Sequence, residues 1–315
     1  MTMATLILDW DRRPPAEFCG GALTIGNFDG VHRGHAALVA EVCRQAQTLG
    51  GPAVAMTFDP HPLQILRPEV FQTVLTTPAY RAELLHACGA DQVIILRTTR
   101  ELLQLSAEEF FQQVIRDRLS ARAIVEGPNF GFGRNRDGNV QALADFCRQA
   151  GLGFVQVAPV QMAGKPVSSS RVRNALVRGA VLEAAEFMGR CYRLRGTVAT
   201  GQKRGRTLGF PTANLEKLET LTPGDGVYAV RVHWSNQTWP GAANIGPNPT
   251  FGEQARKVEV HLIGFAGELV GQEMAIDFVD RLRDTRPFAG AAELVEQLQR
   301  DVEQARSRVE DIAPS

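Results

Sequence analysis

Two histidines, His32 and His35, enclose an arginine and a glycine in the stretch HRGH. The residues before them, Ala22 to Ile25, are apolar and suit a buried strand, and the run Ala36 to Leu49 has helical character. The start of a helix binds anions, because its first backbone N–H groups lack intrahelical partners and the helix dipole is positive there. A strand, a glycine-bearing turn and a helix start beside two imidazoles therefore predict a phosphate-binding site.

Other interpretations of the histidine pair stay open. At a spacing of i, i+3 the two side chains could ligate a metal, although no third ligand lies nearby in the sequence. They could also be ordinary surface residues, or the turn could be a plain strand–helix connection whose glycines serve only the backbone. We favour phosphate binding.

The longer stretch GNFDGVHRGH resembles the HxGH signature of the nucleotidyltransferase superfamily, in the variant of bacterial bifunctional riboflavin kinase/FAD synthetases. Members of that family have an N-terminal adenylyltransferase domain and a C-terminal kinase domain. The resemblance implies phosphate contacts and a catalytic role for His32 and His35. It also implies ATP contacts in the same turn, at Gly26, Asn27, Phe28 and Asp29.

Three further segments resemble adenylyltransferase motifs of this family, in the family's order: TFDPHP at 57–62, GPNFGFG at 127–133 and SSSRVR at 168–173. By resemblance, the flavin or FMN contacts are Phe58, Pro60, His61, Asn129 and Phe130. The implied contacts with the ATP phosphates are Ser168, Ser169, Ser170, Arg171 and Arg173.

Each of these segments has a simpler interpretation. The prolines around His61 could make a structural turn, and the serine run could be a helix-capping loop. Asn129 stands where many family members have Asp, so this position carries no carboxylate charge. Four motifs in one order over about 150 residues nevertheless favour an adenylyltransferase domain.

A second motif set lies further along the chain. The stretch GTVATGQKRGRTLGFPTAN at 196–214 is not a Walker A loop, and a local nucleic-acid patch is an alternative. It resembles the glycine-rich flap and PTAN of riboflavin kinases. The resemblance implies ATP contacts at Gly201, Lys203, Gly205, Arg206, Pro211, Thr212 and Asn214, with Thr212 and Asn214 also binding magnesium.

The kinase motifs continue with NIGPNPTF at 244–251, VEVH at 258–261 and LRDTRPF at 282–288. Resemblance assigns flavin contacts to Arg283 and Phe288, and the role of catalytic base to Glu259. Phosphorylation of a neutral alcohol needs such a base, whereas FMN attacks ATP as an anion and needs none. Strand alternation places Glu259 opposite Val258, Val260 and Leu262. An ordinary exposed glutamate is the alternative.

The elements that must position these residues fall into two patterns. In the first half, apolar strands near 22–25, 52–58, 91–96, 122–126 and 154–158 alternate with helices, which predicts a parallel sheet and a Rossmann-like α/β domain. Ligands of such sheets bind beyond the carboxyl ends of the strands, where the first motifs lie.

After Gly189 short strands at 192–199, 226–234, 239–245, 258–265 and 274–281 predict a small antiparallel β-barrel. The tail from Ala291 to Ile312 has apolar residues at helical spacing and is expected to dock on that barrel. These residues are Leu294, Val295, Leu298 and Val302. We expect an adenylyltransferase domain at 1–186 and a kinase domain at 187–315, since 315 residues suffice for two cores.

Lys plus Arg number 34, as do Asp plus Glu, so we expect neither nucleic acid nor a membrane as a partner. The N-terminal MTMATLILDWDRRPP meets acid and proline before signal-peptide length, and no apolar run approaches a membrane span. Five scattered cysteines without CxxC spacing fit a reducing compartment. They are Cys19, Cys43, Cys88, Cys147 and Cys191. We expect a cytoplasmic protein, and a transient homo-oligomer stays open.

The resemblance implies a bifunctional enzyme that phosphorylates riboflavin to FMN and then adenylylates FMN to FAD, releasing pyrophosphate. Its substrates would be ATP, riboflavin and FMN, with Mg²⁺ as the cofactor. One alternative is a chain with kinase activity only, because of Asn129. Another is a non-catalytic flavin- or nucleotide-binding regulator, which an intact HxGH and Glu259 argue against.

Overall fold

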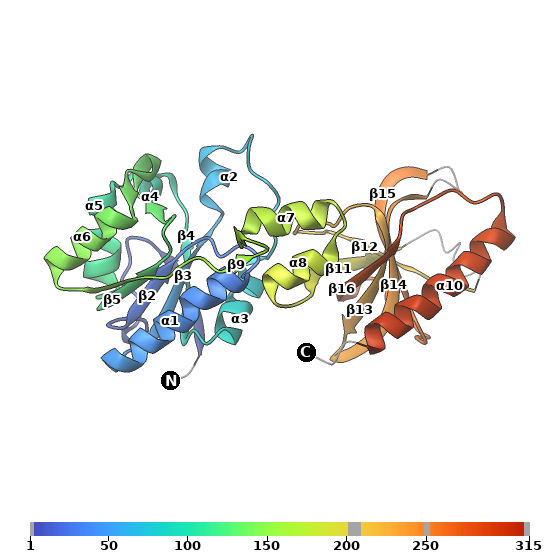
Figure 1. The fold of residues 1–315 in the computed structure, drawn as a ribbon, viewed down its shortest axis with the longest axis horizontal. Coiled ribbons are helices and arrows are strands. Elements are labelled where there is room, and N and C mark those ends of the chain that lie inside the picture. The colour runs from blue at the N-terminus through green and yellow to red at the C-terminus, as the bar shows by residue number, and fades with distance from the viewer. Residues whose placement is uncertain (1–2, 201–208, 249–252, 312–315) are drawn as a thin grey trace. The chain divides into compact units, whose positions relative to one another are not determined.

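The computed structural model describes residues 3–200, 209–248 and 253–311. Backbone contacts divide the chain into two compact units (Figure 1). The first unit runs to Ser168 except for Thr73–Leu75, and the second consists of those three residues and the chain from Ser169 onward. The domain boundary expected at 186/187 lies inside helix α8 (Val181–Met188), and its meaning for function stays a prediction.

A six-stranded parallel sheet forms the first unit, with strand order β1-β4-β3-β2-β5-β8. Its strands are β1 (Ala4–Asp9), β2 (Ala22–Ile25), β3 (Ala53–Asp59), β4 (Gln92–Arg97), β5 (Ala123–Glu126) and β8 (Gly153–Gln156). The predicted parallel α/β sheet is confirmed. Strand β1 was not predicted, because a short apolar run beside charged residues and prolines gives no periodic signal, and its pairing with β4 decides its structure.

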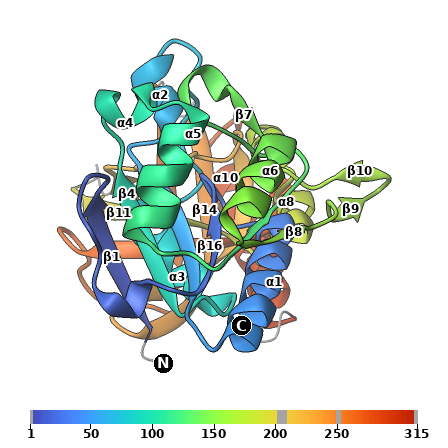
Figure 2. The same ribbon diagram turned by 90° about the vertical axis from the view of Figure 1, so that its left-hand side faces the viewer.

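Helices cover both faces of this sheet. They are η1 (Ala16–Phe18), α1 (Arg33–Leu49), α2 (Pro62–Leu66), α3 (Pro78–Ala87), α4 (Arg100–Gln104), α5 (Ala107–Phe110), the π-helical η2 (Phe111–Arg118), η3 (Arg134–Arg136) and α6 (Val140–Ala150). Helices α4, α5 and α6 lie on one side of the strands and α1 and α3 on the other (Figures 1 and 2). Two short hairpins complete the unit, β6 (Gly131–Phe132) with β7 (Gly138–Asn139) and β9 (Gln161–Met162) with β10 (Lys165–Pro166).

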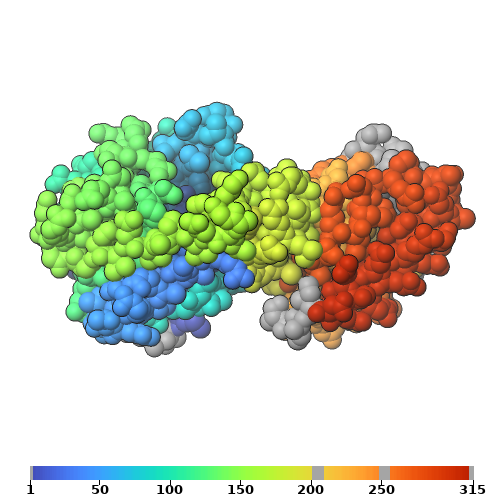
Figure 3. All heavy atoms as spheres, in the orientation of Figure 1, coloured from blue at the N-terminus to red at the C-terminus, as the bar shows by residue number. Residues whose placement is uncertain are grey.

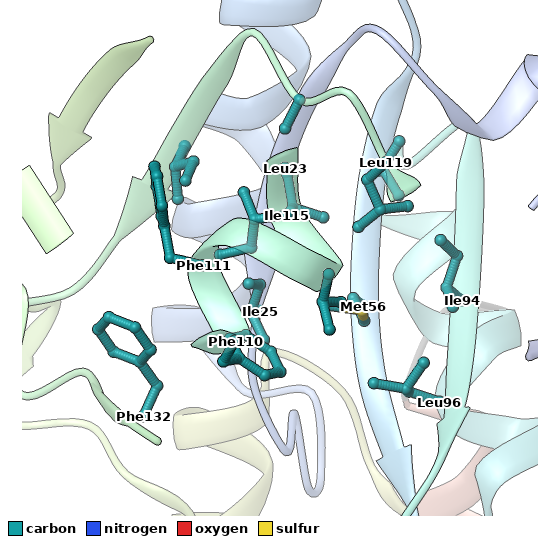
Figure 4. Packing of buried hydrophobic residues seen from close by; sticks show 14 of the residues in the cluster. Leu23, Ile25, Met56, Ile94, Leu96, Phe110, Phe111, Ile115, Leu119 and Phe132 are labelled. Carbon is teal, nitrogen blue, oxygen red and sulfur yellow. The ribbon is translucent and has the colours of Figure 1, made fainter. Parts of the chain in front are cut away.

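The largest core cluster of the first unit lies between the sheet and the α5–η2 segment. Figure 4 shows Leu23, Ile25 and Met56 from neighbouring strands lying against Phe110 and Ile115. All five side chains are buried, and each contributes on the order of 1.5–3 kcal/mol of transfer free energy. This packing holds β2 and β3 against the α5–η2 segment.

The second unit contains a closed antiparallel barrel of six strands, in the order β11-β12-β15-β14-β13-β16. Its strands are β11 (Tyr192–Ala199), β12 (Ala213–Glu216), β13 (Gly226–Trp234), β14 (Gln237–Asn248), β15 (Glu253–Leu262) and β16 (Glu273–Arg283), and its helices are α7 (Ser169–Val177), α8 and α10 (Ala291–Glu310). The predicted barrel and C-terminal helix are confirmed. Strand β12, which carries part of PTAN, was not predicted as a strand.

Helix α10 packs on the outside of the barrel and forms a continuous part of the surface of the second unit (Figure 3). Its most buried side chains are Asp301, Ala305 and Val309. The apolar residues predicted to dock are half-buried instead; they are Leu294, Val295, Leu298 and Val302. Across residues 3–200, 209–248 and 253–311, no helix is long and apolar enough to cross a membrane.

Candidate active sites

The two histidines of HRGH lie against each other at the start of α1. His32 is the N-cap, and its Nδ1 accepts a hydrogen bond from the backbone N–H of His35 at 3.4 Å. Their rings are stacked with centroids 3.7 Å apart, and the ring of Phe28 meets His35 edge-on at 5.1 Å. His32 is buried and His35 half-buried. Both imidazoles are therefore held at a helix N-terminus, where an anion is favoured.

Glycines allow this close packing. A Cβ at Gly34 would lie 3.1–3.2 Å from the His32 imidazole, and a Cβ at Gly26 would lie 3.2–3.3 Å from the Phe28 ring. Gly30 has φ +81°, in the left-handed region where a side chain is strained. The turn thus folds back tightly enough to bury Phe28 beneath the histidines.

A buried arginine that the sequence analysis missed is connected to this turn through hydrogen bonds. Arg81 of α3 is only 2% exposed, and it donates to the Thr57 hydroxyl at 3.0 Å and to the Thr76 carbonyl at 3.2 Å. Its i, i+4 spacing to the buried Leu85 is the sequence signal that could have placed it on the inner helix face. Burial lowers the pKa of Arg81, whereas the carboxylates of Asp29 and Asp59 raise it.

Thr76 connects Arg81 to the turn by hydrogen bonds. Its backbone N–H donates to the buried carboxylate of Asp29 at 3.2 Å, and its hydroxyl accepts from the Gly30 N–H at 3.2 Å. Thr57 in turn donates to the Asn27 carbonyl at 3.0 Å. Asp29 therefore shapes the turn from its buried side, while Asn27 is exposed.

The predicted flavin contacts lie at the ends of the two strands that flank β2. After β3, the His61 Nδ1 accepts from the Leu63 N–H at 3.1 Å and so caps α2, and its ring lies 5.6 Å from that of Phe71. After β5, Phe130 stacks on Phe132 with centroids 5.3 Å apart. Adjacent parallel strands end at the same edge of a sheet. The residues predicted from motifs at β2, β3 and β5 are therefore brought to one edge; besides the turn they include Phe58, Pro60, His61, Asn129 and Phe130.

The serine segment begins beside α1. A Cβ at Gly34 would approach the carbonyl oxygen of Val167 at 3.7 Å, so the chain just before Ser168 passes the helix start. Helix α7 belongs to the second unit, where Arg171 lies over the Phe187 ring at 4.2 Å and Arg173 donates to the Thr73 carbonyl at 3.4 Å. The ATP contacts expected of this segment stay predictions for Ser168, Ser169, Ser170, Arg171 and Arg173.

In the barrel, strand register gathers three polar residues of the kinase motifs. Glu259 of β15 lies opposite Asn214 of β12 on one side and opposite Asn244 of β14 on the other. All three side chains are half-buried, while Val258 and Val260 point into the barrel core. The predicted orientation of Glu259, opposite its apolar neighbours, is confirmed. Register also adds Asn244, to which the sequence analysis gave no role.

The histidine of VEVH fixes the PTAN segment beside this row. His261 Nδ1 donates to the Pro211 carbonyl at 2.8 Å, and its ring meets that of Phe210 at 5.6 Å. Thr212 is exposed next to them. Four residues with predicted ATP contacts lie outside the described residues: Gly201, Lys203, Gly205 and Arg206.

Arg283 and Phe288 lie at the contact between the barrel and α10. The Arg283 guanidinium binds the carboxylate of Asp301, with Nη2 to Oδ2 at 2.7 Å and Nε to Oδ1 at 2.9 Å. It also lies 5.6 Å from the Phe288 ring. The charge of Arg283 is thus already paired, and the flavin contacts predicted for both residues stay predictions.

Comparison with known proteins agrees with this division of motifs. The FAD synthetase family matches residues 15–171 and the riboflavin kinase family residues 188–309. A bifunctional riboflavin kinase/FMN adenylyltransferase of Pseudomonas fluorescens is 38% identical over 296 residues, covering 92% of this chain and 94% of that protein. The chain belongs to this bifunctional family.

Other relatives agree along most of the chain. The enzymes of the same description from Escherichia coli strain K12 and Listeria monocytogenes are 33% and 34% identical; the alignments cover 93% of both chains in the first case, and 90% of this chain and 91% of the relative in the second. A solved structure described as a macrolide-efflux protein from Streptococcus pneumoniae has a TM-score of 0.86 and 32% identity, covering 96% of this chain and 98% of that one.

Proposed function

We propose that this chain makes FAD from riboflavin in two ATP-dependent steps, one at the HRGH turn and one at the Glu259 row. The observation that supports the proposal is that the described residues of the two motif sets belong to two different frameworks, the parallel sheet and the closed barrel. Riboflavin and ATP give FMN and ADP, and FMN and a second ATP give FAD and pyrophosphate.

In the adenylylation step, the phosphate of FMN attacks the α-phosphorus of ATP and pyrophosphate leaves. The nucleophile is already an anion, so alignment and positive potential are the chief requirements. His32, His35 and the first N–H groups of α1 supply both for the phosphates. The serines and arginines of 168–173 would hold the leaving pyrophosphate.

The flavin of FMN would lie over the loops after β3 and β5. Phe58, Phe130 and the His61 ring offer flat apolar faces for an isoalloxazine, and aromatic pairs are stabilised by offset stacking. Pro60 limits the backbone beside His61. Asn129 is exposed at the same edge and contributes an amide in place of the carboxylate of many relatives.

In the kinase step, Glu259 accepts the proton of the terminal ribityl hydroxyl as that oxygen attacks the γ-phosphorus. Asn214 and Asn244, opposite Glu259 in register, keep this carboxylate in a polar row. The glycine-rich stretch with Lys203 and Arg206, together with Pro211, would complete the nucleotide site.

The donor set fits magnesium. The Thr212 hydroxyl and the Asn214 amide oxygen are hard oxygen ligands, and Mg²⁺ prefers a few such ligands together with phosphate oxygens and waters. Thr212 and Asn214 would hold the ion, which would neutralise charge on the phosphates of ATP. Mutation of either residue should therefore weaken nucleotide binding more than flavin binding.

We further propose a reducing, cytoplasmic setting with small molecules as partners, rather than nucleic acid or membranes. All five cysteines are thiols, and the formal charge is balanced. The kinase domain would begin near residue 187, as the kinase motifs suggest. A transient homo-oligomer is compatible with these sites.

Incubation of the protein with riboflavin, ATP and Mg²⁺, followed by chromatography of the flavins, tests the proposal. Successive appearance of FMN and FAD is expected. FMN alone would indicate a kinase whose adenylylation site is inactive. Flavin binding without either product would indicate a regulator.

A further inference from the structure

The pairing between strands β2 and β5 stops before either strand ends. Strand β2 pairs with β3 along its whole length, from Ala22 to Ile25, but it pairs with β5 only at Ala22 and Leu23. Both strands nevertheless continue for two more residues. Strands β3 and β4 follow on one side of β2, and β5 and β8 on the other, so this pair is the point at which the winding reverses. Ligand crevices of open α/β sheets lie at such points.

A buried carboxyl group fills the opening. Glu126, the last residue of β5, is 2% exposed, and its Oε1 accepts the backbone N–H of Ile25 at 2.6 Å. The Thr24 hydroxyl donates to the same oxygen at 3.5 Å, and the Gly127 N–H also donates to this carboxyl group. A side-chain oxygen therefore takes the place of a backbone acceptor for the last amide of β2.

This one group contacts the residue that precedes one substrate loop and the first residue of the other. Ile25 directly precedes the Gly26–Gly30 turn, and Gly127 begins the loop that carries Asn129 and Phe130. Burial raises the pKa of Glu126 well above its usual value, while the hydrogen bonds from Ile25, Thr24 and Gly127 act in the opposite direction. The contacts of its acceptor oxygen with both strands give the group its place at the crevice.

We propose that Glu126 is a positioning residue for FMN adenylylation, which holds β2 and β5 apart at the crevice and fixes the spacing between the phosphate turn and the flavin loop. The inference rests on the proposed adenylylation site. Misplacement of a reacting group by about an ångström can cost on the order of a hundredfold in rate. Loss of the acceptor should thus affect the reaction more than the fold.

The test compares Glu126→Gln, which keeps a neutral acceptor oxygen, with Glu126→Leu, which removes it. Kinetics of FAD formation from FMN and ATP are measured on the full-length chain, and riboflavin phosphorylation by the same protein is the internal control. We expect kcat/KM for FAD formation to fall at least about tenfold in the Leu variant and to stay within about threefold in the Gln variant. Phosphorylation should stay within about twofold in both.

Ile94→Val is the matched control. Ile94 is fully buried in the same sheet, and its side chain has no hydrogen-bonding group. It should lower the melting temperature and leave both activities within about twofold. Glu126→Met, with a more adaptable side chain, replaces the Leu variant if that variant does not fold.

The proposal would be overturned if Glu126→Leu formed FAD with wild-type kinetics, or if Glu126→Gln and Glu126→Leu lost the same amount of FAD-forming activity. It would also be overturned if Ile94→Val lost as much of this activity as Glu126→Leu. Amide hydrogen exchange gives a readout that does not need turnover. Faster exchange at 25–30 and 127–132 in the Leu variant, but not in the Gln variant, supports the role even if the wild-type chain formed no FAD. Unchanged exchange in both segments would overturn it.

Discussion

His32 and His35 illustrate how a motif depends on the small residue inside it. The stacked imidazoles lie at the N-terminus of α1, and Gly34 leaves just enough room for the His32 ring. In the barrel, Glu259 lies in a different environment, among amide side chains on a strand. The proposed function requires positive potential for an anionic nucleophile at the first site and a base for a neutral nucleophile at the second.

This difference predicts a reciprocal loss of activity. His35→Ala should lower adenylylation of supplied FMN by about 10²–10³, because a contact with developing charge is lost, while FMN formation persists. Glu259→Gln should lower riboflavin phosphorylation by about 10²–10⁴ and spare adenylylation. Both half-reactions are measured on both variants, with circular dichroism to verify folding. If either folded variant lost both activities equally, or neither, the two-site assignment would be wrong.

Asn129 is expected to tolerate a charge. Its side chain is exposed, and its backbone carbonyl accepts from Arg136 at 3.1 Å, so the loop is held through its backbone. Asn129→Asp should therefore leave FAD formation within roughly tenfold, or about 1.4 kcal/mol of barrier. Steady-state rates with FMN and ATP test this. A hundredfold change in either direction would show that the charge matters.

The pKa of Glu126 makes stability depend on pH. Because burial raises this pKa in the folded protein, the unfolded chain releases the proton first, at about pH 4.3. From there up to the raised folded pKa, the folded state binds more protons, so stability falls as pH rises, by at most about 1.4 kcal/mol per pH unit. Relative to Glu126→Gln, wild type should lose melting temperature as the pH rises above about 4.3. Calorimetry of both proteins tests this, and a difference that stays constant with pH would refute the raised pKa of Glu126.

At the scale of elements, strands and helices hold the sites by register and by docking. Antiparallel pairing of β15 with β12 and β14 places three polar side chains in one row, and a one-residue slip would turn Glu259 into the barrel core. Helix α10 is docked by its buried Asp301, which binds Arg283 of β16. The apolar residues of α10 that were predicted to dock on the barrel are only half-buried, so they contribute less to docking than expected.

The Arg283–Asp301 pair should matter much more than a surface pair on the same helix. The Arg283 and Asp301 side chains are 20% and 2% exposed, whereas those of Arg300 and Glu296 are 60% and 63% exposed. Arg283→Ala leaves a buried carboxylate uncompensated and should cost about 3–5 kcal/mol of stability. Arg300→Ala should change stability by less than about 0.5 kcal/mol.

Urea unfolding of both variants, followed by tryptophan fluorescence, measures these costs. Trp234 and Trp239 report on the barrel and Trp10 on the first unit. Equal effects of the two substitutions would mean that Asp301 is not a buried partner of Arg283. A large loss of riboflavin affinity in Arg283→Ala, without loss of stability, would instead support the predicted flavin contact.

At the scale of the whole chain, two sheet architectures carry two half-reactions. The parallel sheet gathers loops at one edge, and the barrel presents residues along its outer face. Helices α7 and α8 belong to the same compact unit as the barrel. The FAD synthetase match ends at residue 171, and the riboflavin kinase match begins at residue 188. The kinase should therefore be separable from the adenylyltransferase.

We predict that residues 169–315 alone phosphorylate riboflavin. The shorter fragment 187–315 should remain active but be less stable, because it lacks most of α8, including the buried Val181 and Ala184; this helix packs on β11 and β16. Activity and melting temperature of both fragments are compared with the full-length chain. Inactive but folded fragments would show that the kinase needs the first unit.

Motifs in the sequence were enough to indicate both half-reactions, the parallel sheet and the barrel. Local signals sufficed because caps, strand periods and signature turns are encoded by neighbouring residues, as with His32 at its N-cap and the Ser106 capping box. Strand alternation likewise gave the orientation of Glu259.

Only the tertiary structure brought together residues distant in the chain. Arg81 binds Thr76, which binds Asp29; Glu126 binds Ile25; and Asp301 binds Arg283. In the sequence, the charged residues Arg81, Glu126 and Asp301 look like ordinary surface residues. A charged side chain is normally exposed, and burial becomes favourable only when hydrogen-bonding partners are supplied by other elements. That condition is met by packing, which no local pattern records.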